Sequence, residues 1–411
     1  MPLVFVTYSL AYLDRANYGL AAAAGMANDL HITAAMSSLL GSLFLLGYFV
    51  FQIPGAIYAE RSSVRRLIIA SMVVWGLCSA LTGVITNVSA LLVIRFLMGV
   101  AEAAVMPAML IYIARWFSRS ERSMANTLFI LGNPATVLWM SILSGYLIAA
   151  FNWRWMFIME GVPAILWAFV GWAPAADRPA EAHWLTDEEK AAIARAVASE
   201  ESELIAVRNY RGMFTSPKIL ILGLQYGCWS AGVFGFVLWL PSILKSGITM
   251  GIVEAGWLSA APYVVAIVAM LVVSYRARHS NRKTYVWCSL ALAAVAFAAL
   301  YFFKDTNYWA SYGLLIFAGA AMYAPYGPYW SMVAELLPEN VRGGAMALIN
   351  SMGAFGGFIG SYVIGYLNGA THGPGASYVL LCAALIVAAL SMFLVGAPKK
   401  PLGVDAIRTA A

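Results

Sequence analysis

The sequence predicts an all-α membrane protein with twelve transmembrane helices, arranged as two pseudo-symmetric bundles of six. Three observations predict this class: an apolar composition, regularly spaced apolar segments, and an internal similarity between the two halves of the chain. Of the 411 residues, 62% are hydrophobic and 11% are charged, and the mean hydropathy is +0.78. Soluble domains carry about a quarter charged residues, so the composition excludes soluble, disordered and fibrous proteins.

The apolar segments are long enough to cross a bilayer as helices, which takes about 20 residues each. Polar residues or Gly and Pro separate them, and the unbroken run 290–303 lacks the alternation of a transmembrane β-strand. The predicted spans are 3–27, 36–58, 65–86, 89–113, 124–149, 153–174, 216–243, 253–274, 284–303, 309–333, 343–367 and 375–396.

Positive charge is distributed unevenly between the two sets of loops. Short loops rich in Lys and Arg stay in the cytoplasm. The loops after even-numbered spans contain Arg61, Arg65, Arg66, Arg115, Arg119, Arg122, Arg276, Arg278, Arg282, Lys283 and Arg342. The loops on the other side contain Arg154, Lys245 and Lys304. We therefore expect both termini in the cytoplasm, Lys399, Lys400 and Arg408 included, and the chain in a bacterial inner membrane.

One polar stretch divides the chain. It contains Thr186-Asp187-Glu188-Glu189, a capping box that predicts a helix running to about Leu204. We interpret this stretch as a linker, with a regulatory site as the alternative. The predicted organisation is an N-terminal bundle 1–174, a cytoplasmic linker 175–215, a C-terminal bundle 216–398 and a cytoplasmic tail 399–411.

The two bundles resemble each other in sequence. Shifting the chain by 220 residues aligns 99–150 with 319–370 without a gap and gives twelve identities. Composition alone would give about four or five, so the match favours a duplication. Two parallel six-helix halves with a site between them are typical of a secondary transporter.

Five charged residues fall inside predicted spans, all in the first half: Asp14, Arg15, Arg95, Glu102 and Glu160. A charge at the middle of a membrane helix costs on the order of 3 kcal/mol, so such residues are candidates for function. At the 220-residue offset the counterparts of the first four are uncharged. Structural pairs in a two-fold scaffold should tend to recur in both halves, so this asymmetry indicates chemistry assigned to the first half.

The four charges nearest one another predict a shared polar cavity between the first and fourth spans. A guanidinium stays protonated and matches a carboxylate with a planar fork, so we expect Arg15 and Arg95 to bind an anionic substrate. A carboxyl group in a low-dielectric cavity can exchange a proton, so we expect Asp14 and Glu102 to carry protons. The alternative is that Asp14–Arg95 and Arg15–Glu102 are ion pairs that lock a conformation.

Glu160 is placed by the sequence near the outer end of the sixth span. A pair with Arg154 or a position at the membrane interface explains it at least as well as a role in transport.

The second half offers aromatic and amide groups instead of charges. Pro325 and Pro328 interrupt the tenth span, as breaks near a midplane site often do. Stacking and amide hydrogen bonds suit a hydroxylated ligand; the alternative is interfacial anchoring and packing. The groups in question are Tyr323, Tyr326, Tyr329, Trp330, Asn350 and Ser351. Overlapping GxxxG patterns indicate close helix packing at Gly353, Gly356, Gly357 and Gly360.

Several other functions are disfavoured. The basic residues form no continuous stripe, so we expect no nucleic-acid partner. All four histidines lie in loops and the four cysteines lie far apart, so we expect no intramembrane metal and no cofactor. Hydrolase and nucleotide-binding motifs do not occur in a plausible context, so we do not expect an enzyme.

The motifs resemble those of the major facilitator superfamily and, within it, the anion:cation symporter family of organic-acid and sugar-acid permeases. The resemblance covers essentially the whole chain. It is carried by Tyr12-Leu13-Asp14-Arg15-Ala16-Asn17, Gly47-Tyr48 through Gln52-Ile53-Pro54-Gly55, Arg95-Phe96-Leu97-Met98-Gly99 through Glu102-Ala103 and Pro107, Trp116-Phe117 through Glu121-Arg122, and Asn152-Trp153-Arg154-Trp155-Met156-Phe157. The loop Glu60-Arg61-Ser62-Ser63-Val64-Arg65-Arg66 departs from the superfamily pattern, because it keeps the charge and loses the glycine spacing.

The resemblance implies roles for particular residues. In similar family members the arginines matching Arg15 and Arg95 bind the substrate carboxylate, and the acids matching Asp14 and Glu102 carry protons. Positions that line the sugar-acid pocket match Tyr12, Tyr48, Asn133, Trp330 and Asn350.

From residues and resemblance together, we expect a monomeric importer of a small hydroxylated organic anion, such as an aldonate, uronate or aldarate, driven by proton symport. The alternatives are a proton-independent exchanger or uniporter, a drug exporter, and a membrane receptor that binds without transport.

Overall fold

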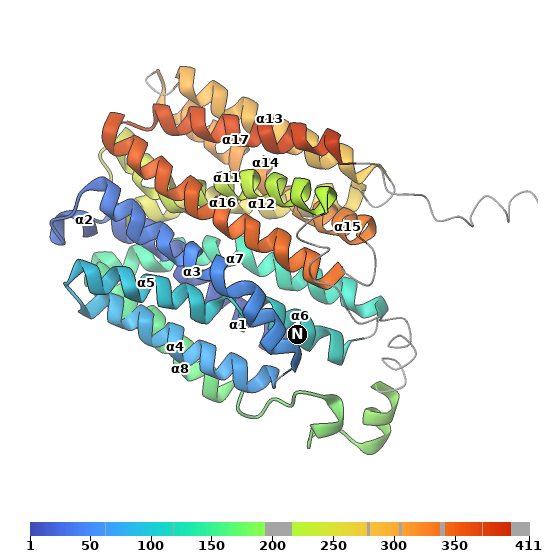
Figure 1. Cartoon of the computed structure of the whole chain (residues 1–411). Helices are drawn as coiled ribbons and strands as arrows, with labels where there is room; N and C mark the ends of the chain where they lie inside the picture. The colour runs from blue at the N-terminus through green and yellow to red at the C-terminus, as the bar shows by residue number, and fades with distance from the viewer. Residues whose placement is uncertain are drawn as a thin grey trace, which may run out of the picture.

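The computed structural model describes residues 1–61, 63–117, 119–193, 216–277, 280–303, 306–337, 342–371 and 373–395. In these ranges the regular structure is helical, and no strand occurs (Figure 1). The first half contains α1 (Pro2–Ala23), α2 (Met26–Asp29), α3 (Ala34–Arg61), α4 (Val64–Val84), α5 (Val88–Glu102), α6 (Val105–Trp116), α7 (Arg119–Ala150) and α8 (Trp153–Val170), followed by the short 3-10 helix η1 (Pro179–Glu181). The second half contains α11 (Pro217–Gly247), α12 (Ile252–Ala277), α13 (Arg282–Phe303), α14 (Tyr308–Tyr323), α15 (Tyr326–Leu336), α16 (Arg342–Thr371) and α17 (Gly375–Leu394).

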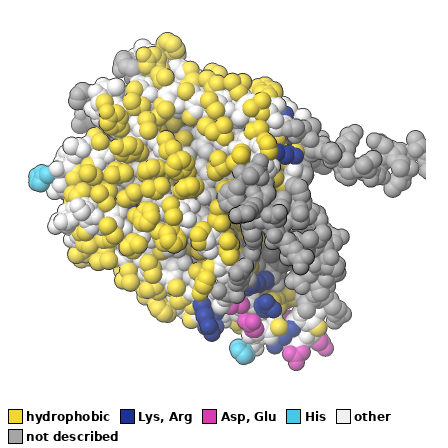
Figure 2. Space-filling view, in the orientation of Figure 1, with side chains coloured by type: hydrophobic (Ala, Val, Ile, Leu, Met, Phe, Trp, Pro, Cys, Tyr) yellow, Lys and Arg dark blue, Asp and Glu magenta, His cyan; other side chains and the backbone are white. Residues whose placement is uncertain are grey.

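These helices correspond to the twelve predicted spans and confirm the predicted fold class. Within the described residues, nine stretches meet the length and apolarity of a membrane span. The space-filling view shows a broad apolar surface along the bundle (Figure 2). The first span ends at Ala23, earlier than predicted, because Gly25 adopts a left-handed backbone (φ 101°) and starts a separate short helix.

Two spans are each broken into two helices, at equivalent places in the two halves. α5 ends at Glu102 and α6 begins at Val105, while α14 ends at Tyr323 and α15 begins at Tyr326. The sequence predicts the second break from its prolines but not the first. Pro107 explains the first break, because it has no N–H to bond to the carbonyl four residues earlier. Glu102 therefore lies at a helix end near the middle of the bundle.

The linker is described up to residue 193. The predicted capping box is present: the Thr186 N–H donates to Glu189 Oε2 (2.9 Å) and the Glu189 N–H donates to Thr186 Oγ1 (3.3 Å). A helix follows from 187 to 193. The remainder of this predicted helix, to Leu204, and the predicted tail 399–411 lie outside the described residues.

The two six-helix groups face each other across one interface. α1 packs on α11, α3 on α16, and α7 on α12. In Figure 1 the blue-to-green first half lies below the yellow-to-red second half. We call the end of the bundle where α8 ends and α11 begins the linker end, and the other end the far end.

The two halves meet backbone to backbone toward the far end. A Cβ atom on Gly19 of α1 would collide with the backbone of Leu238 in α11. A Cβ on Gly256 of α12 would lie 2.5 Å from the carbonyl oxygen of Ser141 in α7. Glycine at these positions lets the backbones meet, so the far end is sealed by direct contact between the halves.

The GxxxG patterns of α16 give the close packing that the sequence predicts. Gly356 contacts the backbone of Gly227, and Gly360 contacts Ala231, both in α11. This packing joins two helices of the second half, and it holds α16 so that Asn350 points toward the first half.

Candidate functional site

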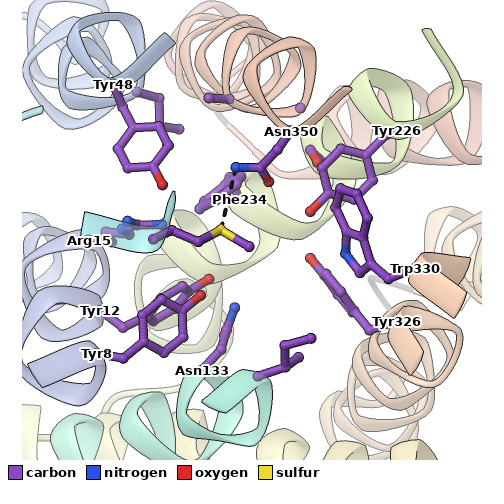
Figure 3. A pocket seen from close by; sticks show the side chains of 16 residues that line it. Tyr8, Tyr12, Arg15, Tyr48, Asn133, Tyr226, Phe234, Tyr326, Trp330 and Asn350 are labelled. Atoms are coloured by element: carbon purple, nitrogen blue, oxygen red, sulfur yellow. Dashed lines mark hydrogen bonds between the residues drawn. The ribbon is translucent and has the colours of Figure 1, made fainter. Parts of the chain in front are cut away.

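A pocket lies between the two halves, near the middle of the helices. α1, α3, α6 and α7 line it from the first half, and α11, α15 and α16 line it from the second. Six of the seven residues predicted to bind substrate line this pocket: Tyr12, Arg15, Tyr48, Asn133, Trp330 and Asn350. Figure 3 shows their side chains around a common space, with Arg15 on one side and Trp330 on the other.

The pocket walls carry polar groups that the protein itself does not fully satisfy. The hydroxyls of Tyr12, Tyr48 and Ser230 and the amide oxygen of Asn133 are buried without a hydrogen-bond partner. The Asn350 amide meets the sulfur of Met106 at 3.5 Å, a weak acceptor (Figure 3). Buried polar groups are normally paired, so these groups are available to a ligand that brings hydroxyls or carboxylates.

Arg15 forms an ion pair with Glu102 at the edge of the pocket. Arg15 Nε donates to Glu102 Oε1 at 2.7 Å, and Nη2 donates to the same oxygen. The second oxygen, Oε2, is buried without a partner. The guanidinium carbon lies 4.6 Å from the centre of the Tyr48 ring and 5.2 Å from that of Tyr12. One carboxylate oxygen and two aromatic faces therefore hold the cation against the pocket.

Arg95 does not line the pocket. It is 1% exposed, and its Nε donates to the carbonyl of Leu40 at 3.3 Å. The guanidinium carbon lies 5.1 Å from the Tyr18 ring centre, and Nη2 is buried without a partner. Among the described residues the ion pair with Asp14, considered as an alternative above, does not occur. Arg95 lies on α5 two turns closer to the far end than Glu102.

Asp14 also lies outside the pocket, in a second polar cluster. Asp14 Oδ1 accepts from Ser79 Oγ at 2.6 Å and from Asn17 Nδ2 at 3.3 Å. The expected single chamber with four charged groups is therefore wrong. Asp14 and Arg15 are neighbours on α1 and point about 100° apart, so Arg15 faces α5 while Asp14 faces α4 and α8.

Glu160 belongs to the same second cluster, which corrects its expected placement. It is 4% exposed near the middle of α8 and accepts from Asn17 Nδ2 (2.9 Å) and from Ser144 Oγ. Arg154 instead donates to the carbonyls of Gly83 and Ile85. Neither the expected Arg154 pair nor an interfacial position describes Glu160.

The sequence profile of the Major Facilitator Superfamily matches residues 4–361. The chain belongs to the major facilitator superfamily. A putative tartrate transporter of Agrobacterium vitis is 30% identical over 412 residues, covering 97% of this chain and 90% of that protein. A quinolone resistance transporter of Acinetobacter baumannii is 26% identical over 403 residues, covering 96% and 92%. The chain is thus similar to membrane transporters, not to enzymes.

The solved structures support the same fold. The inward-open conformation of the xylose transporter XylE from E. coli matches with a TM-score of 0.75 and 16% identity, covering 99% of each chain. At this identity the likeness concerns the fold. This major facilitator chain is a secondary transporter with many membrane passes, and the pocket between its halves is its candidate transport site.

Some pocket residues were not found by sequence reasoning. Tyr8, Tyr226, Ser230 and Phe234 all line the pocket of this superfamily member. Tyr8 precedes Tyr12 by one helical turn, and Ser230 follows Tyr226 by one turn. This spacing places each pair on one helix face, a signal that could have identified them.

The predicted aromatic residues of the second half divide into two groups. Tyr326 and Trp330 line the pocket, while Tyr323 and Tyr329 are buried behind it. Tyr226 lies 5.1 Å from Trp330 and 5.4 Å from Tyr329 between ring centres. The interfacial alternative does not apply to these rings, because they lie inside the bundle.

Proposed function

We propose that the protein imports a small hydroxylated organic anion, of the sugar-acid type, by proton symport. The observation that supports this proposal is Arg15, a guanidinium in a pocket whose other polar groups are hydroxyls and amides. Such a pocket suits a carboxylate attached to a hydroxylated chain, as in aldonates, uronates and aldarates. The similarity to a putative tartrate transporter agrees with this class, since tartrate is a dihydroxy dicarboxylate.

Arg15 would bind two carboxylates in turn. Without substrate it is paired with Glu102. Protonation of Glu102 removes the charge of its partner and leaves the guanidinium without a counter-ion in a low-dielectric site, which is costly. The substrate carboxylate then restores the balance. Substrate and proton are thereby coupled through one cation, and both leave when Glu102 ionises and recovers Arg15.

The second half would recognise the body of the substrate. Trp330 and Tyr326 offer ring faces, and Asn350 and Ser230 offer hydrogen-bonding groups from α16 and α11. From the first half, Tyr12 and Tyr48 add hydroxyls beside Arg15, and Asn133 adds an amide. Each substrate hydroxyl that meets one of these buried groups gains a hydrogen bond and satisfies an unpaired atom.

Arg95 and Asp14 take the second pair of roles. We assign Arg95 to anion binding in the conformation open at the far end, because its guanidinium lies against Tyr18, one turn beyond Arg15 toward that end, and its Nη2 has no partner. We assign Asp14 to a second proton. In this scheme the far end faces the extracytoplasmic side, the termini are cytoplasmic, and a single chain is the transporting unit, since the pocket draws on both of its halves.

The alternative is a proton-independent organic-anion exchanger or uniporter. The Arg15–Glu102 pair itself favours it as the second candidate, because a substrate carboxylate can replace an ionised Glu102 without a proton. The two mechanisms differ in what drives accumulation.

Uptake into proteoliposomes separates these mechanisms. The substrate is first chosen by thermal-shift screening of the purified protein against aldonates, uronates, aldarates and simple dicarboxylates. Labelled substrate is then offered with and without an imposed inward proton gradient. Symport requires accumulation above equilibrium that depends on the gradient. Equal uptake with and without the gradient would favour exchange or uniport. Binding without any uptake would favour a receptor, and stabilisation by bulky cations alone would favour a drug exporter.

A further inference from the structure

A second buried cluster of polar side chains lies in the first half, away from the pocket. It consists of Asp14 and Asn17 on α1, Ser79 on α4, Ser144 on α7 and Glu160 on α8. Each of these residues is at most 4% exposed, and none lines the pocket. The proposed function gives Asp14 a proton and leaves the rest of the cluster unexplained.

Asn17 connects the two carboxyl groups of this cluster. Its Nδ2 donates to Glu160 Oε2 at 2.9 Å and to Asp14 Oδ1 at 3.3 Å. A serine hydroxyl also donates to each acid, Ser79 to Asp14 at 2.6 Å and Ser144 to Glu160. Four helices thus meet at one hydrogen-bonded group that contains two acids.

The cluster contains more acceptors than donors. The amide of Asn17 offers two hydrogens, and the two serines offer one each. The two carboxyl groups and the Asn17 carbonyl together have five oxygens, of which Asp14 Oδ2 and Asn17 Oδ1 are buried without a partner. A proton on one of the acids supplies a donor that the cluster lacks and removes a buried charge.

Among the described residues, neither acid forms an ion pair with a Lys or Arg side chain. The charge that interacts with the Glu160 carboxylate is that of Asp14, another acid, and this interaction is repulsive. α4 contributes the thiol of Cys78 beside Asp14. Arg95 attracts the Asp14 carboxylate electrostatically but forms no hydrogen bond with it. Arg154 donates its hydrogen bonds to backbone carbonyls instead. Two acids that share a dry site do not both ionise while the site is closed to water, because the repulsion and the desolvation are both costly. The proton is released only in a conformation that hydrates the site.

We propose that Asp14 and Glu160, bridged by Asn17, form one proton-binding site that holds a single shared proton. Glu160 is then a coupling residue of the transport cycle, although it does not touch the substrate. This inference rests on the proposed proton symport. The site is coupled to the pocket through α1, because α1 carries both the cluster and Arg15. The charge of the cluster therefore affects how α1 packs and where Arg15 lies.

The first test compares the pH dependence of uptake in two variants. In Glu160→Gln the shape is kept but Asp14 loses its acidic neighbour, so we expect half-maximal uptake to require about tenfold more protons, or about one pH unit. In Ser144→Ala both acids remain, but the ionised form of Glu160 loses a donor, so we expect a shift toward higher pH. Shifts in opposite directions are not expected from a purely structural cluster. The matched control is Glu254→Gln, an exposed acid in the first turn of α12.

The shared proton also predicts non-additivity. We expect each single substitution, Asp14→Asn or Glu160→Gln, to leave one acid that titrates at a shifted pH, and the double variant to lose the pH dependence that arises from this site, which is more than the sum of the two shifts. An unchanged pH profile in Glu160→Gln, or additive effects of the two substitutions, would overturn the proposal. Thermal unfolding of each purified variant verifies that it is folded.

A second measurement separates this proposal from the proposed function. Infrared spectroscopy of the purified wild type should show the carbonyl band of a protonated carboxylic acid, reduced in Glu160→Gln and Asp14→Asn and unchanged in Glu254→Gln. If the band is reduced in these two variants while uptake does not depend on the proton gradient, proton symport is refuted and the shared proton site is supported. If uptake depends on the proton gradient and the band is unchanged in both variants, the shared proton site is refuted and proton symport is supported. Uptake that follows a sodium gradient instead would assign the cluster to another cation and overturn the proposal.

Discussion

Arg15 is a planar cation that can pair with one carboxylate at a time along its most favourable edge. In the structure that carboxylate is Glu102, and Tyr12 and Tyr48 restrict the guanidinium from its faces. A competing carboxylate must approach from the pocket, where the hydroxyls and amides lie. The specificity for an anion therefore depends on a cation that the protein already neutralises, and the binding affinity depends on the charge of Glu102.

Replacing Arg15 by Lys should weaken substrate binding strongly. Lysine keeps the charge but not the fork that binds a carboxylate in two places. We expect the dissociation constant to rise at least about tenfold, or about 1.4 kcal/mol. Titration calorimetry of the purified protein measures it. Arg154→Lys is the matched control, because that arginine contacts backbone carbonyls outside the pocket. Equal affinity of Arg15→Lys and wild type would exclude Arg15 as the carboxylate ligand.

Replacing Glu102 by Gln should separate binding from coupling. Glutamine cannot carry the proton and does not neutralise Arg15, so the substrate binds but its accumulation no longer follows a proton gradient. We expect counterflow exchange to persist while gradient-driven uptake falls to the level without a gradient. The two assays use the same proteoliposomes, with Glu254→Gln as the control. Gradient-driven accumulation in Glu102→Gln would refute the coupling role of Glu102.

The sequence predicted most residues of the site but not their partners. A charge in an apolar helix predicted Arg15, and aromatic and amide groups beside a broken span predicted Trp330 and Asn350. The family resemblance implied Tyr12, Tyr48 and Asn133. The choice between Arg15–Glu102 and Asp14–Arg95 depends on how α1 is rotated against α5, which is determined by packing between helices. Glu160 was misplaced for the same reason, because its partners Asn17 and Ser144 come from two other helices.

At the scale of the helices, α1 combines two functions on different faces. One face presents Tyr8, Tyr12 and Arg15 to the pocket, and another presents Asp14 and Asn17 to α4 and α8. Helix lengths were predicted well because the apolar thickness of a bilayer is a direct constraint on the sequence. The break between α5 and α6 is not evident from the sequence, because Pro107 lies within a long apolar run that predicts one continuous span.

Gly256 tests the packing that seals the far end. Gly256→Val places a branched side chain against the Ser141 carbonyl, so α12 can no longer pack closely on α7. We expect a shift toward the conformation open at the far end and a loss of transport of tenfold or more, on the order of 1.4 kcal/mol. Ala354 lines the pocket, so a cysteine at this position, in a background without the native cysteines, reports the shift by faster labelling from the far-end side.

Gly313→Val is the matched control for this experiment, because a Cβ at Gly313 in α14 meets no atom within 4 Å. It changes a glycine to valine in an exposed place and should leave labelling and uptake near wild type. If Gly256→Val behaves like the control, the α7–α12 contact does not hold the far end closed.

At the scale of the whole molecule, the two halves share a fold but differ in chemistry. The breaks between α5 and α6 and between α14 and α15 occur at equivalent positions, so the duplication suggested by the 220-residue offset is visible in the backbone. The first half holds the buried acids and arginines, and the second half adds rings and an amide to the pocket. A motion of one half against the other thus moves the proton-binding groups relative to the groups that recognise the body of the substrate.

The two proposed proton sites of the first half predict that transport responds to the membrane potential. One proton on Glu102 and one shared by Asp14 and Glu160 exceed the charge of a monovalent anion by one. A potential of about 100 mV, negative inside, is worth about 2.3 kcal/mol per net charge, which corresponds to roughly fiftyfold accumulation. We therefore expect a potassium diffusion potential in proteoliposomes with equal pH on both sides to drive uptake of a monovalent sugar acid. The Glu102→Gln variant exchanges substrate without net accumulation, so the potential should not drive uptake in it. A wild type that ignores the potential while following a pH gradient would mean that a single proton accompanies each anion, and the second site would then have no part in transport.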